Sequence, residues 1–255
     1  MISEERLDRI VEFVNKNQYA SVSGLMKLVN ASKSTIRRDL IQLSESGKIC
    51  LVRGGAASLN KGFVPESAYQ EKMGINIAEK QRIGKKAASL IQPGETIFIA
   101  PGTTTRTLFP NLADIENLNI ITNDIQIAND MALNNNKNIF ITGGWLRKDY
   151  YSMSGYQTEE ALRSMKISTA FISCDAIDAL TGCYIANSDE VGVTRQVIKS
   201  ANHVVVMADH SKFCSNAFLQ ICDFSQVDFL ITDDGLPSDI LSLFKKKQNT
   251  KLIVV

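Results

Sequence analysis

From about residue 76 onward the chain alternates short apolar segments with amphipathic ones, and this alternation constrains the fold more than any other feature. The strand-like segments are ETIFIA, LNIIT, KNIFITGG, STAFISCDAI, HVVVMAD, VDFLITDD and TKLIVV. Helix-like stretches such as EKQRIGKKAASLI and IQIANDMAL separate them. Near-continuous apolar strands are typical of parallel sheets that helices cover on both faces. The pattern therefore predicts an α/β domain with a mainly parallel sheet over residues 76–255, preceded by a linker at 58–75, where the periodicity is lost.

The N-terminal part, residues 1–57, follows a helical pattern that then changes to a strand pattern. One face of a first helix, over about residues 4–17, is apolar and carries Leu7, Ile10, Val11 and Val14. A second helix is predicted to start at Ser21 or Ser23, and a third after the N-cap Ser32. The following KICLVRGGAAS predicts a β-ribbon that turns at its two glycines. Three short helices and a ribbon indicate an α+β domain of the winged helix-turn-helix type.

The third predicted helix presents a cationic surface that also bears hydroxyl groups. Its apolar residues dock inward, at Ile36, Leu40 and Leu43, and this turns five others toward solvent, namely Lys33, Ser34, Thr35, Arg37 and Arg38. Such side chains bind phosphates and base edges when a helix enters the major groove of DNA. Residues 1–60 also carry nine Lys and Arg against six Asp and Glu, a net charge of +3 that favours a polyanion. The alternative is a protein-interaction module whose arginines only solvate that face.

Polar or small residues follow most of the predicted strands of the second domain. In an open parallel sheet, ligands bind beyond the carboxyl ends of the strands, where loops lead into the next helices. The candidate pocket residues are Gly102, Thr103, Thr104, Thr105, Thr122, Asn123, Gly143, Gly144, Asp175, Asp209 and Lys212. A Thr-rich turn at a helix start suits a phosphate, Lys212 can pair with that phosphate, and Asp209 can accept sugar hydroxyls. These loops predict a pocket for a phosphorylated polyol, whereas the Thr-rich turn by itself is explained equally well as a helix cap.

Several motifs of enzymes and metal proteins do not occur in the sequence. It has no GxSxG, GxxxxGK[ST] or HExxH motif, and its two histidines, His203 and His210, make no metal-ligand pattern with the cysteines. We therefore expect no metal, no cofactor and no catalytic residues. Five cysteines without a CxxC pair predict reduced thiols rather than a disulfide framework. A charged N-terminus and the lack of a long apolar stretch predict a cytoplasmic protein without membrane contact.

The chain resembles the DeoR-type transcriptional repressors along almost its whole length. The run Ser34-Thr-Ile-Arg-Arg-Asp-Leu40 and the Arg53-Gly-Gly-Ala56 wing are similar to the DNA-binding domain of that family. Further motifs resemble its sensor domain in order, and these are Asn76 to Lys80 with Ile83, Gly102 to Thr105, Thr122-Asn123, Gly143-Gly144, Gly155, Phe171 and Asp209 to Phe213. The resemblance implies a C-terminal fold like that of ribose-5-phosphate isomerases. It also implies a homo-oligomer, either a dimer or a tetramer.

The function that this resemblance implies is sequence-specific repression of a sugar or polyol catabolic operon. The exposed residues of the third helix would enter or flank the major groove of double-stranded operator DNA, and Arg53 would touch its backbone from the wing. A phosphorylated sugar held by Gly102 to Thr105 and Lys212 would release the DNA. The sequence departs from the family at Ala100 and Pro101, which stand where the family commonly has an acid before the Gly-Thr-Thr loop.

Two other functions are compatible with the sequence. A sugar-phosphate isomerase-like enzyme with an added N-terminal domain would use the same α/β fold, but the sequence offers only scattered carboxylates and no convincing acid/base pair. A DNA-binding scaffold whose α/β domain only oligomerises would bind no small anion. Turnover of a phosphosugar would favour the enzyme, and failure of every small anion to bind would favour the scaffold.

Overall fold

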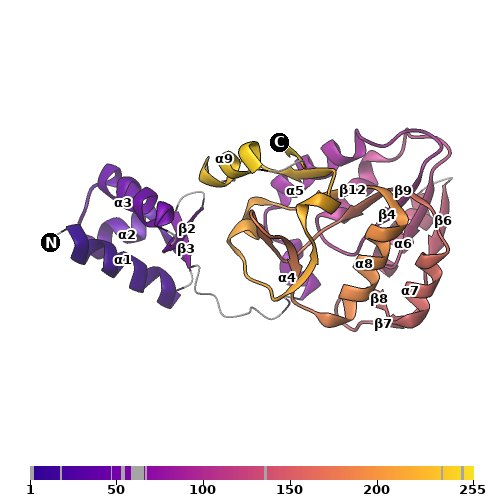
Figure 1. The fold of residues 1–255 in the computed structure, drawn as a ribbon, viewed down its shortest axis with the longest axis horizontal. Coiled ribbons are helices and arrows are strands. Elements are labelled where there is room, and N and C mark those ends of the chain that lie inside the picture. The colour runs from indigo at the N-terminus through magenta and orange to yellow at the C-terminus, as the bar shows by residue number, and fades with distance from the viewer. Residues whose placement is uncertain are drawn as a thin grey trace.

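The computed structural model arranges the 255-residue chain as a small N-terminal domain and a larger C-terminal domain. It describes residues 3–17, 19–46, 48–52, 55–58, 66, 68–134, 137–236, 238–247 and 250–255. Figure 1 shows the N-terminal domain, in indigo, at one end of the long axis of the molecule. Across these described ranges, no helix is both long enough and apolar enough to cross a membrane.

The N-terminal domain has the predicted helices and ribbon, together with one strand that was not predicted. Its elements are α1 (Ser3–Asn17), β1 (Tyr19–Ser21), α2 (Val22–Val29), α3 (Lys33–Glu45), β2 (Ile49–Val52) and β3 (Gly55–Ser58). The Ser21 side chain caps α2 by accepting from the Gly24 N–H, and Ser32 caps α3 by accepting from the Thr35 N–H. The three strands form an antiparallel sheet in the order β1-β3-β2. The β2–β3 ribbon is the predicted wing, and its turn at Arg53-Gly54 lies outside the described residues.

The core of the N-terminal domain is built from that domain's own residues. Its buried members come from α1, β1, α2, α3, β2 and β3, and they are Ile10, Val14, Ala20, Leu25, Val29, Ile36, Leu40, Leu43, Ile49 and Ala56. The three residues of α3 that were predicted to point inward, Ile36, Leu40 and Leu43, are each at most 2% exposed. Their burial fixes the orientation of α3, because the opposite face must then meet solvent.

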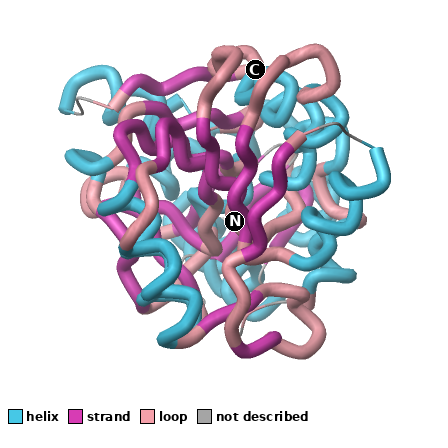
Figure 2. The backbone as a smooth tube through the Cα atoms, turned by 90° about the vertical axis from the view of Figure 1, so that its right-hand side faces the viewer, coloured by secondary structure: helices cyan, strands magenta, loops and turns pink. Residues whose placement is uncertain are grey.

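The C-terminal domain contains the predicted parallel sheet. Seven strands lie in the order β15-β14-β12-β9-β4-β5-β6, and every neighbouring pair is parallel. They are β4 (Thr96–Ile99), β5 (Asn119–Thr122), β6 (Asn138–Ile141), β9 (Ile167–Ile172), β12 (Ala201–Met207), β14 (Phe229–Thr232) and β15 (Lys251–Val254). Figure 2 shows strands running through the middle of the molecule with helices to either side. The prediction of α/β architecture is therefore confirmed.

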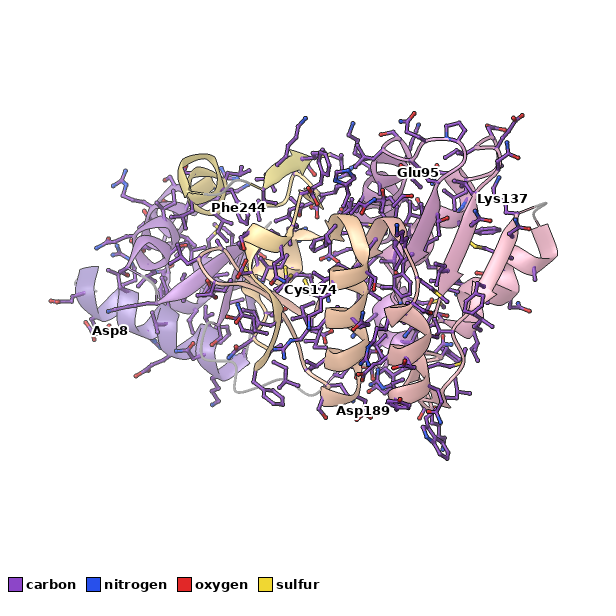
Figure 3. All side chains as sticks on the ribbon, turned by 45° about the vertical axis from the view of Figure 1, so that its right-hand side comes forward. Asp8, Glu95, Lys137, Cys174, Asp189 and Phe244 are labelled. Atoms are coloured by element: carbon purple, nitrogen blue, oxygen red, sulfur yellow. The ribbon has the colours of Figure 1, made fainter. Side chains whose placement is uncertain are left out.

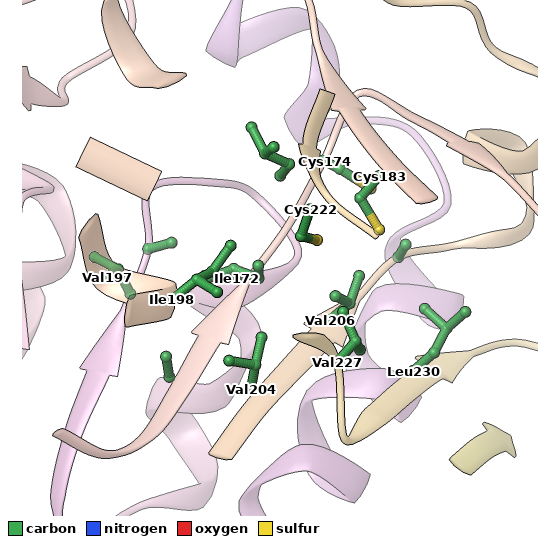
Figure 4. Close-up of a cluster of buried hydrophobic side chains, with 14 of the residues drawn as sticks. Ile172, Cys174, Cys183, Val197, Ile198, Val204, Val206, Cys222, Val227 and Leu230 are labelled. Carbon is green, nitrogen blue, oxygen red and sulfur yellow. The ribbon is translucent and has the colours of Figure 1, made fainter. Parts of the chain in front are cut away.

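Helices cover both faces of this sheet, because alternate residues of each strand point to opposite sides. The helices are α5 (Ile77–Ala88), α6 (Ile125–Asn134), α7 (Tyr156–Arg163), α8 (Val191–Ser200) and α9 (Ser238–Lys247). Phe171 and Val205 pack in a cluster with residues of α5 and α6, whereas Ile172, Val204 and Val206 pack with residues of α7, α8 and α9 (Figure 4). Each central strand is thus buried on both sides, which explains its continuous apolar sequence.

Short elements complete the C-terminal domain. Three strands, β10 (Ala176–Asp178), β11 (Gly182–Ile185) and β13 (Leu219–Cys222), form a small antiparallel sheet, and β7 (Trp145–Leu146) pairs with β8 (Met153–Ser154). Four segments are 3-10 helices, namely η1 (Thr105–Asn111), η2 (Ser188–Glu190), η3 (His210–Cys214) and η4 (Phe224–Gln226). The helix predicted from TTTRTLFPNLADI is therefore a seven-residue 3-10 segment, with Pro110 inside it.

One helix lies inside the range predicted as a linker. This is α4 (Tyr69–Met73), and its Tyr69 is only 4% exposed. The Tyr69 ring contacts the Tyr151 ring edge to face, and its hydroxyl accepts from Arg106. The chain from α4 onward is thus packed onto the C-terminal domain.

The cysteines depart from the prediction at one position. Cys174 (labelled in Figure 3), Cys183 and Cys222 are free, buried and close together (Figure 4). Hydrogen bonds of the protonated Cys183 thiol with the two neighbouring cysteines, together with burial, raise its pKa, so this group stays protonated. Cys214, by contrast, is disulfide-bonded, which corrects the prediction of reduced thiols for that residue.

Candidate nucleic-acid interface and ligand pocket

The first half of α3 presents the predicted cationic surface to solvent. Four of the predicted residues are exposed and Thr35 is partly exposed, the four being Lys33, Ser34, Arg37 and Arg38. The Ser32 hydroxyl lies 2.9 Å from the hydroxyls of both Ser34 and Thr35, so hydroxyl groups cluster at the start of the helix. Within the described ranges, no carboxylate lies at ion-pair distance from Arg37 or Arg38. Both guanidinium groups are therefore available to an external anion.

A buried ion pair that the sequence did not reveal fixes this helix against α1. Arg6 donates from Nε to Asp39 Oδ2 at 2.7 Å and from Nη2 to Asp39 Oδ1 at 2.9 Å. Asp39 is 3% exposed, although it directly follows the two exposed arginines in the sequence. The hydrogen bond that Arg6 donates to Asp39 raises the pKa of Arg6 above its usual value. The pair orients α3 because it holds the only acid of the STIRRDL run on the inner side.

A pocket lies in the C-terminal domain, beyond the carboxyl ends of the adjacent strands β12, β9 and β4. Its lining residues are Glu66, Tyr69, Lys72, Pro101, Gly102, Thr103, Thr104, Tyr150, Ser173, Cys174, Asp175, Ile185, Glu190 and Lys212. Five of them were predicted from the sequence, namely Gly102, Thr103, Thr104, Asp175 and Lys212. The rule that ligands bind beyond the carboxyl ends of parallel strands thus leads to a real cavity.

An ion pair between Lys72 of α4 and Asp175 spans part of this pocket. The Lys72 ammonium lies 2.8 Å from Asp175 Oδ1, and the Asp175 Oδ2 accepts from the Ala186 N–H at 3.0 Å. Burial alone would lower the pKa of Lys72 and raise that of Asp175, but the attraction between the two outweighs burial. The pKa of Lys72 is therefore raised and that of Asp175 is lowered. Both groups are charged at neutral pH.

A second charged cluster is centred on Arg147, which is 8% exposed. Its guanidinium donates to Glu66 at 2.5 Å and also pairs with Glu190, and the Glu190 carboxylate accepts from the Ser152 hydroxyl at 2.8 Å. Burial raises the pKa of Glu66 and outweighs the opposing effect of Arg147. Two of the three carboxylates that line the pocket are thus already paired with this arginine.

Lys212 lines the pocket and makes no ion pair with the described residues. Within the part of the chain that the structure describes, no carboxylate lies at ion-pair distance from its ammonium group. Lys80 lies behind it and donates to the Lys72 carbonyl at 2.6 Å. Burial and the charges of Lys72 and Lys212 outweigh the attraction of Asp209 and lower the pKa of Lys80 to about 8. An anion bound beside Lys212 would relieve this repulsion between cations.

Six of the predicted pocket residues do not line the cavity. Thr105, Thr122 and Asn123 are buried, and their side chains bond to the protein itself. The Thr105 hydroxyl donates to the Ala100 carbonyl at 2.7 Å and the Thr122 hydroxyl to the Ile99 carbonyl at 2.7 Å. Asn123 donates to the Met153 carbonyl at 2.8 Å. These groups shape the loops that surround the pocket rather than facing a ligand.

The other three residues outside the cavity are Gly143, Gly144 and Asp209. Gly144 has φ of +120°, and a Cβ at this position would lie 2.1 Å from the Thr158 hydroxyl, which donates to the Gly143 carbonyl. Gly144 therefore permits a close contact with α7. Asp209 accepts from the Asn76 amide at 2.8 Å and from the Ser211 N–H at 3.0 Å. It caps η3 and so positions Lys212.

Several lining residues were not among the predicted pocket residues, and three of these come from the range predicted as a linker. These are Glu66, Tyr69 and Lys72. The range was predicted as a linker because α4, a helix of five residues, is too short to give a periodic signal. Tyr150 comes from a loop whose position depends on the folding of distant segments. This chain lacks the acid that the family commonly has at Ala100 and Pro101, and the carboxylates that line its pocket belong to Glu66, Asp175 and Glu190.

Two family models match the chain. The model described as DeoR-like helix-turn-helix domain matches residues 6–62, and the model described as DeoR C terminal sensor domain matches residues 75–234. The two matches correspond to the N-terminal domain and to most of the C-terminal domain.

Similar proteins over nearly the full length are named as regulators. The uncharacterized HTH-type transcriptional regulator YgbI of Escherichia coli (strain K12) is 35% identical over 254 residues, which is 100% of this chain and 98% of that protein. The HTH-type transcriptional repressor GlcR of Bacillus subtilis (strain 168) is 31% identical, over 100% and 97% of the two chains. The glycerol-3-phosphate regulon repressor of Escherichia coli (strain K12) is 30% identical, over 95% and 96%.

Distant likenesses to solved structures accompany these matches. Ribose 5-phosphate isomerase from Plasmodium falciparum aligns with a TM-score of 0.40 and 16% identity over 54% of this chain and 53% of that chain. The full-length sorbitol operon regulator SorC from Klebsiella pneumoniae aligns with a TM-score of 0.38 and 11% identity over 100% and 96%.

Proposed function

Because the chain belongs to the DeoR family of transcriptional regulators, we propose that it represses a sugar or polyol catabolic operon and leaves its operator when a phosphorylated sugar binds the C-terminal pocket. The chain is a regulator rather than an enzyme, as its relatives are. One observation carries most weight. The same chain has a solvent-exposed cationic face on α3 and a pocket lined by Lys212, which makes no ion pair within the described residues. We place its action in the cytoplasm, on double-stranded DNA.

On the DNA side, α3 is the reading element of this proposal. Ser34, Thr35, Arg37 and Arg38 enter or flank the major groove, and Lys33 pairs with a phosphate at its edge. The exposure of these side chains and the inward anchoring of Asp39 support that orientation. Arg53, which lies outside the described residues, stays the proposed contact from the wing.

On the effector side, the ligand's phosphate lies between Lys212 and the Gly102 to Thr104 turn. Lys212 supplies the charge and the turn supplies backbone N–H and hydroxyl donors. The carboxylates of Asp175 and Glu190 accept hydroxyl groups of the polyol chain. Thr105, Thr122, Asn123, Gly143, Gly144 and Asp209 are left out of the contact set because they do not reach the cavity. The names of two relatives, a glycerol-3-phosphate regulon repressor and GlcR, agree with a small phosphorylated polyol or sugar as the effector class.

We further propose that the protein acts as a homo-oligomer, a dimer or tetramer. The edge strand β6 and the following β7 leave large apolar side chains in solvent, with Phe140 48%, Trp145 76% and Leu146 55% exposed. Tyr156, at the start of α7, adds to this patch. A second copy of the chain would cover it and would present two α3 helices to half-sites about 34 Å apart or a multiple of that spacing.

The test is fluorescence anisotropy of the full-length protein on duplex DNA from upstream of its own operon, titrated with a panel of phosphorylated sugars and polyols. Release by one compound supports the proposal and names its pathway. The variant Lys212→Ala should lose this response, and its DNA binding without ligand reports that it is folded. Tight DNA binding that no panel compound alters would contradict the effector part, and turnover of a panel compound would contradict the regulator assignment.

A further inference from the structure

The pocket is lined in part by the segment that connects it to the N-terminal domain. Glu66, Tyr69 and Lys72 all reach the cavity, and they precede the rest of the C-terminal domain in the chain. A ligand in this pocket therefore contacts the very stretch of chain through which the two domains are covalently joined. The other lining residues belong to loops of the sheet and carry no such connection.

We propose that the Lys72–Asp175 ion pair is a latch that the effector opens, with the anionic group of the effector replacing Asp175 as the partner of Lys72. This inference rests on the proposed function, since it states how the same pocket controls DNA binding. Opening the latch frees Asp175 to accept ligand hydroxyls and removes one of the contacts that hold α4 beside the pocket. The arrangement of the N-terminal domains that binds the operator is then less stable, because the connecting segment has lost its ion pair to Asp175.

The exposure of the pair suits exchange with a ligand. The Lys72 and Asp175 side chains are 23% and 22% exposed, so both are reachable from the cavity and yet partly shielded from water. Within the described residues, Asp175 is the one side chain that Lys72 Nζ bonds to, at 2.8 Å. A phosphate dianion offers Lys72 more charge and more acceptor oxygens than a single carboxylate does. Asp175, in turn, keeps its hydrogen bond from Ala186 after the exchange.

A second ion pair, between Glu66 and Arg147, also holds this segment and is more deeply buried than the Lys72–Asp175 pair. Glu66 and Arg147 have side chains 10% and 7% exposed, and Arg147 is also held by Glu190, Ser152 and the Tyr150 ring. Breaking this buried pair would leave an uncompensated charge, which costs far more than exchanging one partner of Lys72 for another. Glu66 is therefore anchored more firmly than Lys72, and the Lys72–Asp175 pair is the contact of this segment that a ligand can exchange.

The latch makes a quantitative prediction, because coupling between two sites is reciprocal. If the effector weakens operator binding by opening the latch, then breaking the latch by mutation weakens operator binding without any effector. The ratio of operator affinity without and with effector then falls by the same factor, because the mutation has already broken the contact that the effector would break.

The experiment compares Lys72→Met and Asp175→Asn with a matched control, Arg82→Met. Arg82 on α5 also makes a 2.7 Å ion pair, to Asp234, but with side chains 43% and 65% exposed and away from the pocket. Operator affinity is measured by anisotropy without ligand and with the panel compound that releases the wild type. Each latch variant should bind the operator about fivefold or more weakly without ligand, and its release ratio should drop correspondingly. Arg82→Met should match the wild type in both quantities.

A conservative variant separates a positioning role from simple damage to the fold. Lys72→Arg keeps the cation and should restore most of the operator affinity and release ratio, while thermal melts check that all variants are folded. Wild-type values in both Lys72→Met and Asp175→Asn would overturn the latch. A wild type that no panel compound releases would instead overturn the proposed function, and the ligand-free operator affinities would still decide the latch.

Discussion

At the scale of single residues, Asp124 shows how a buried carboxylate can work against stability. It is fully buried and caps α6 by accepting from the N–H groups of Gln126 at 2.7 Å and Ile127 at 3.1 Å. Its Oδ2 atom has no hydrogen-bond partner among the described residues. Burial raises the pKa of Asp124 to about 6 and outweighs the backbone hydrogen bonds that favour the charged form.

The variant Asp124→Asn should therefore stabilise the protein at pH 7.5. The carboxyl has a higher pKa in the folded state than in the unfolded state, so its unfavourable contribution is absent below about pH 4 and grows as the pH rises to about 6. Asparagine still caps the helix without a charge, so the gain at pH 7.5 should be about 1 to 3 kcal/mol. Urea unfolding at pH 7.5 and pH 4.5 measures it. An equal gain at both pH values, or a gain in the exposed control Asp114→Asn, would contradict this explanation.

The substitution Gly144→Ala should destabilise the protein more than Gly94→Ala. Both glycines have positive φ, at +120° and +83°, but a Cβ at Gly94 meets nothing within 4 Å, whereas one at Gly144 meets the Thr158 hydroxyl at 2.1 Å and the Ser154 carbonyl at 2.7 Å. We expect a difference of about 1 to 3 kcal/mol in the free energy of unfolding. Equal losses would show that backbone strain alone matters at both positions.

At the scale of elements, α3 was predictable because burial of one face dictates the exposure of the other. Ser32 and Ser21 were correctly predicted as caps, since each precedes an apolar periodic run. Short elements such as β1 and α4 were missed, because three or five residues carry no measurable period. The missed α4 explains why Tyr69 and Lys72 were not foreseen in the pocket.

Some of the predicted pocket residues line the cavity and others do not, depending on which strand they follow and where their side chains bond. Residues that directly follow strands β4, β9 and β12 reach the cavity, because the parallel sheet brings these strand ends together. Residues at the ends of β5 and β6 also lie at this edge of the sheet, but the side chains of Thr122 and Asn123 bond to backbone carbonyls of other segments. Which polar side chain turns inward depends on hydrogen bonds such as that from Thr122 to Ile99, and no local pattern specifies those.

The double variant Arg37→Ala and Arg38→Ala should weaken operator binding at least tenfold while leaving the melting temperature within a few degrees of the wild type. Both side chains are exposed, so their loss removes contacts to DNA and leaves the core intact. The slope of log affinity against log salt should fall by about 1 for each arginine that contacts a phosphate. A charge-matched control, Arg9→Ala with Lys16→Ala on α1, should have a smaller effect. Unchanged binding by the α3 variant would contradict this orientation.

At the scale of the whole molecule, the apolar patch on β6 and β7 is the clearest candidate for contact between subunits. Edge strands that expose apolar side chains invite pairing with another chain unless something covers them. The patch lies on the C-terminal domain, so an interface there would leave α3 free to bind DNA.

Trp145→Glu combined with Leu146→Glu should lower the molar mass measured by light scattering after size-exclusion chromatography. Two charges at the centre of an apolar interface cost several kcal/mol, which is enough to dissociate a moderate dimer. The control Leu180→Glu changes an equally exposed apolar residue, 59% exposed, elsewhere on the domain. Wild-type mass in the double variant would place the interface on another surface.

The closed core of the N-terminal domain has an evolutionary consequence. Because the buried residues of that core all lie between Ile10 and Ala56, the packing that shapes the DNA-reading surface does not depend on which sensor follows it. A recombination event, or a designed gene fusion, that joins two family members between β3 and α4 would preserve both cores. Operator choice and metabolite choice can therefore be inherited as separate traits, with the latch residues of α4 travelling with the sensor.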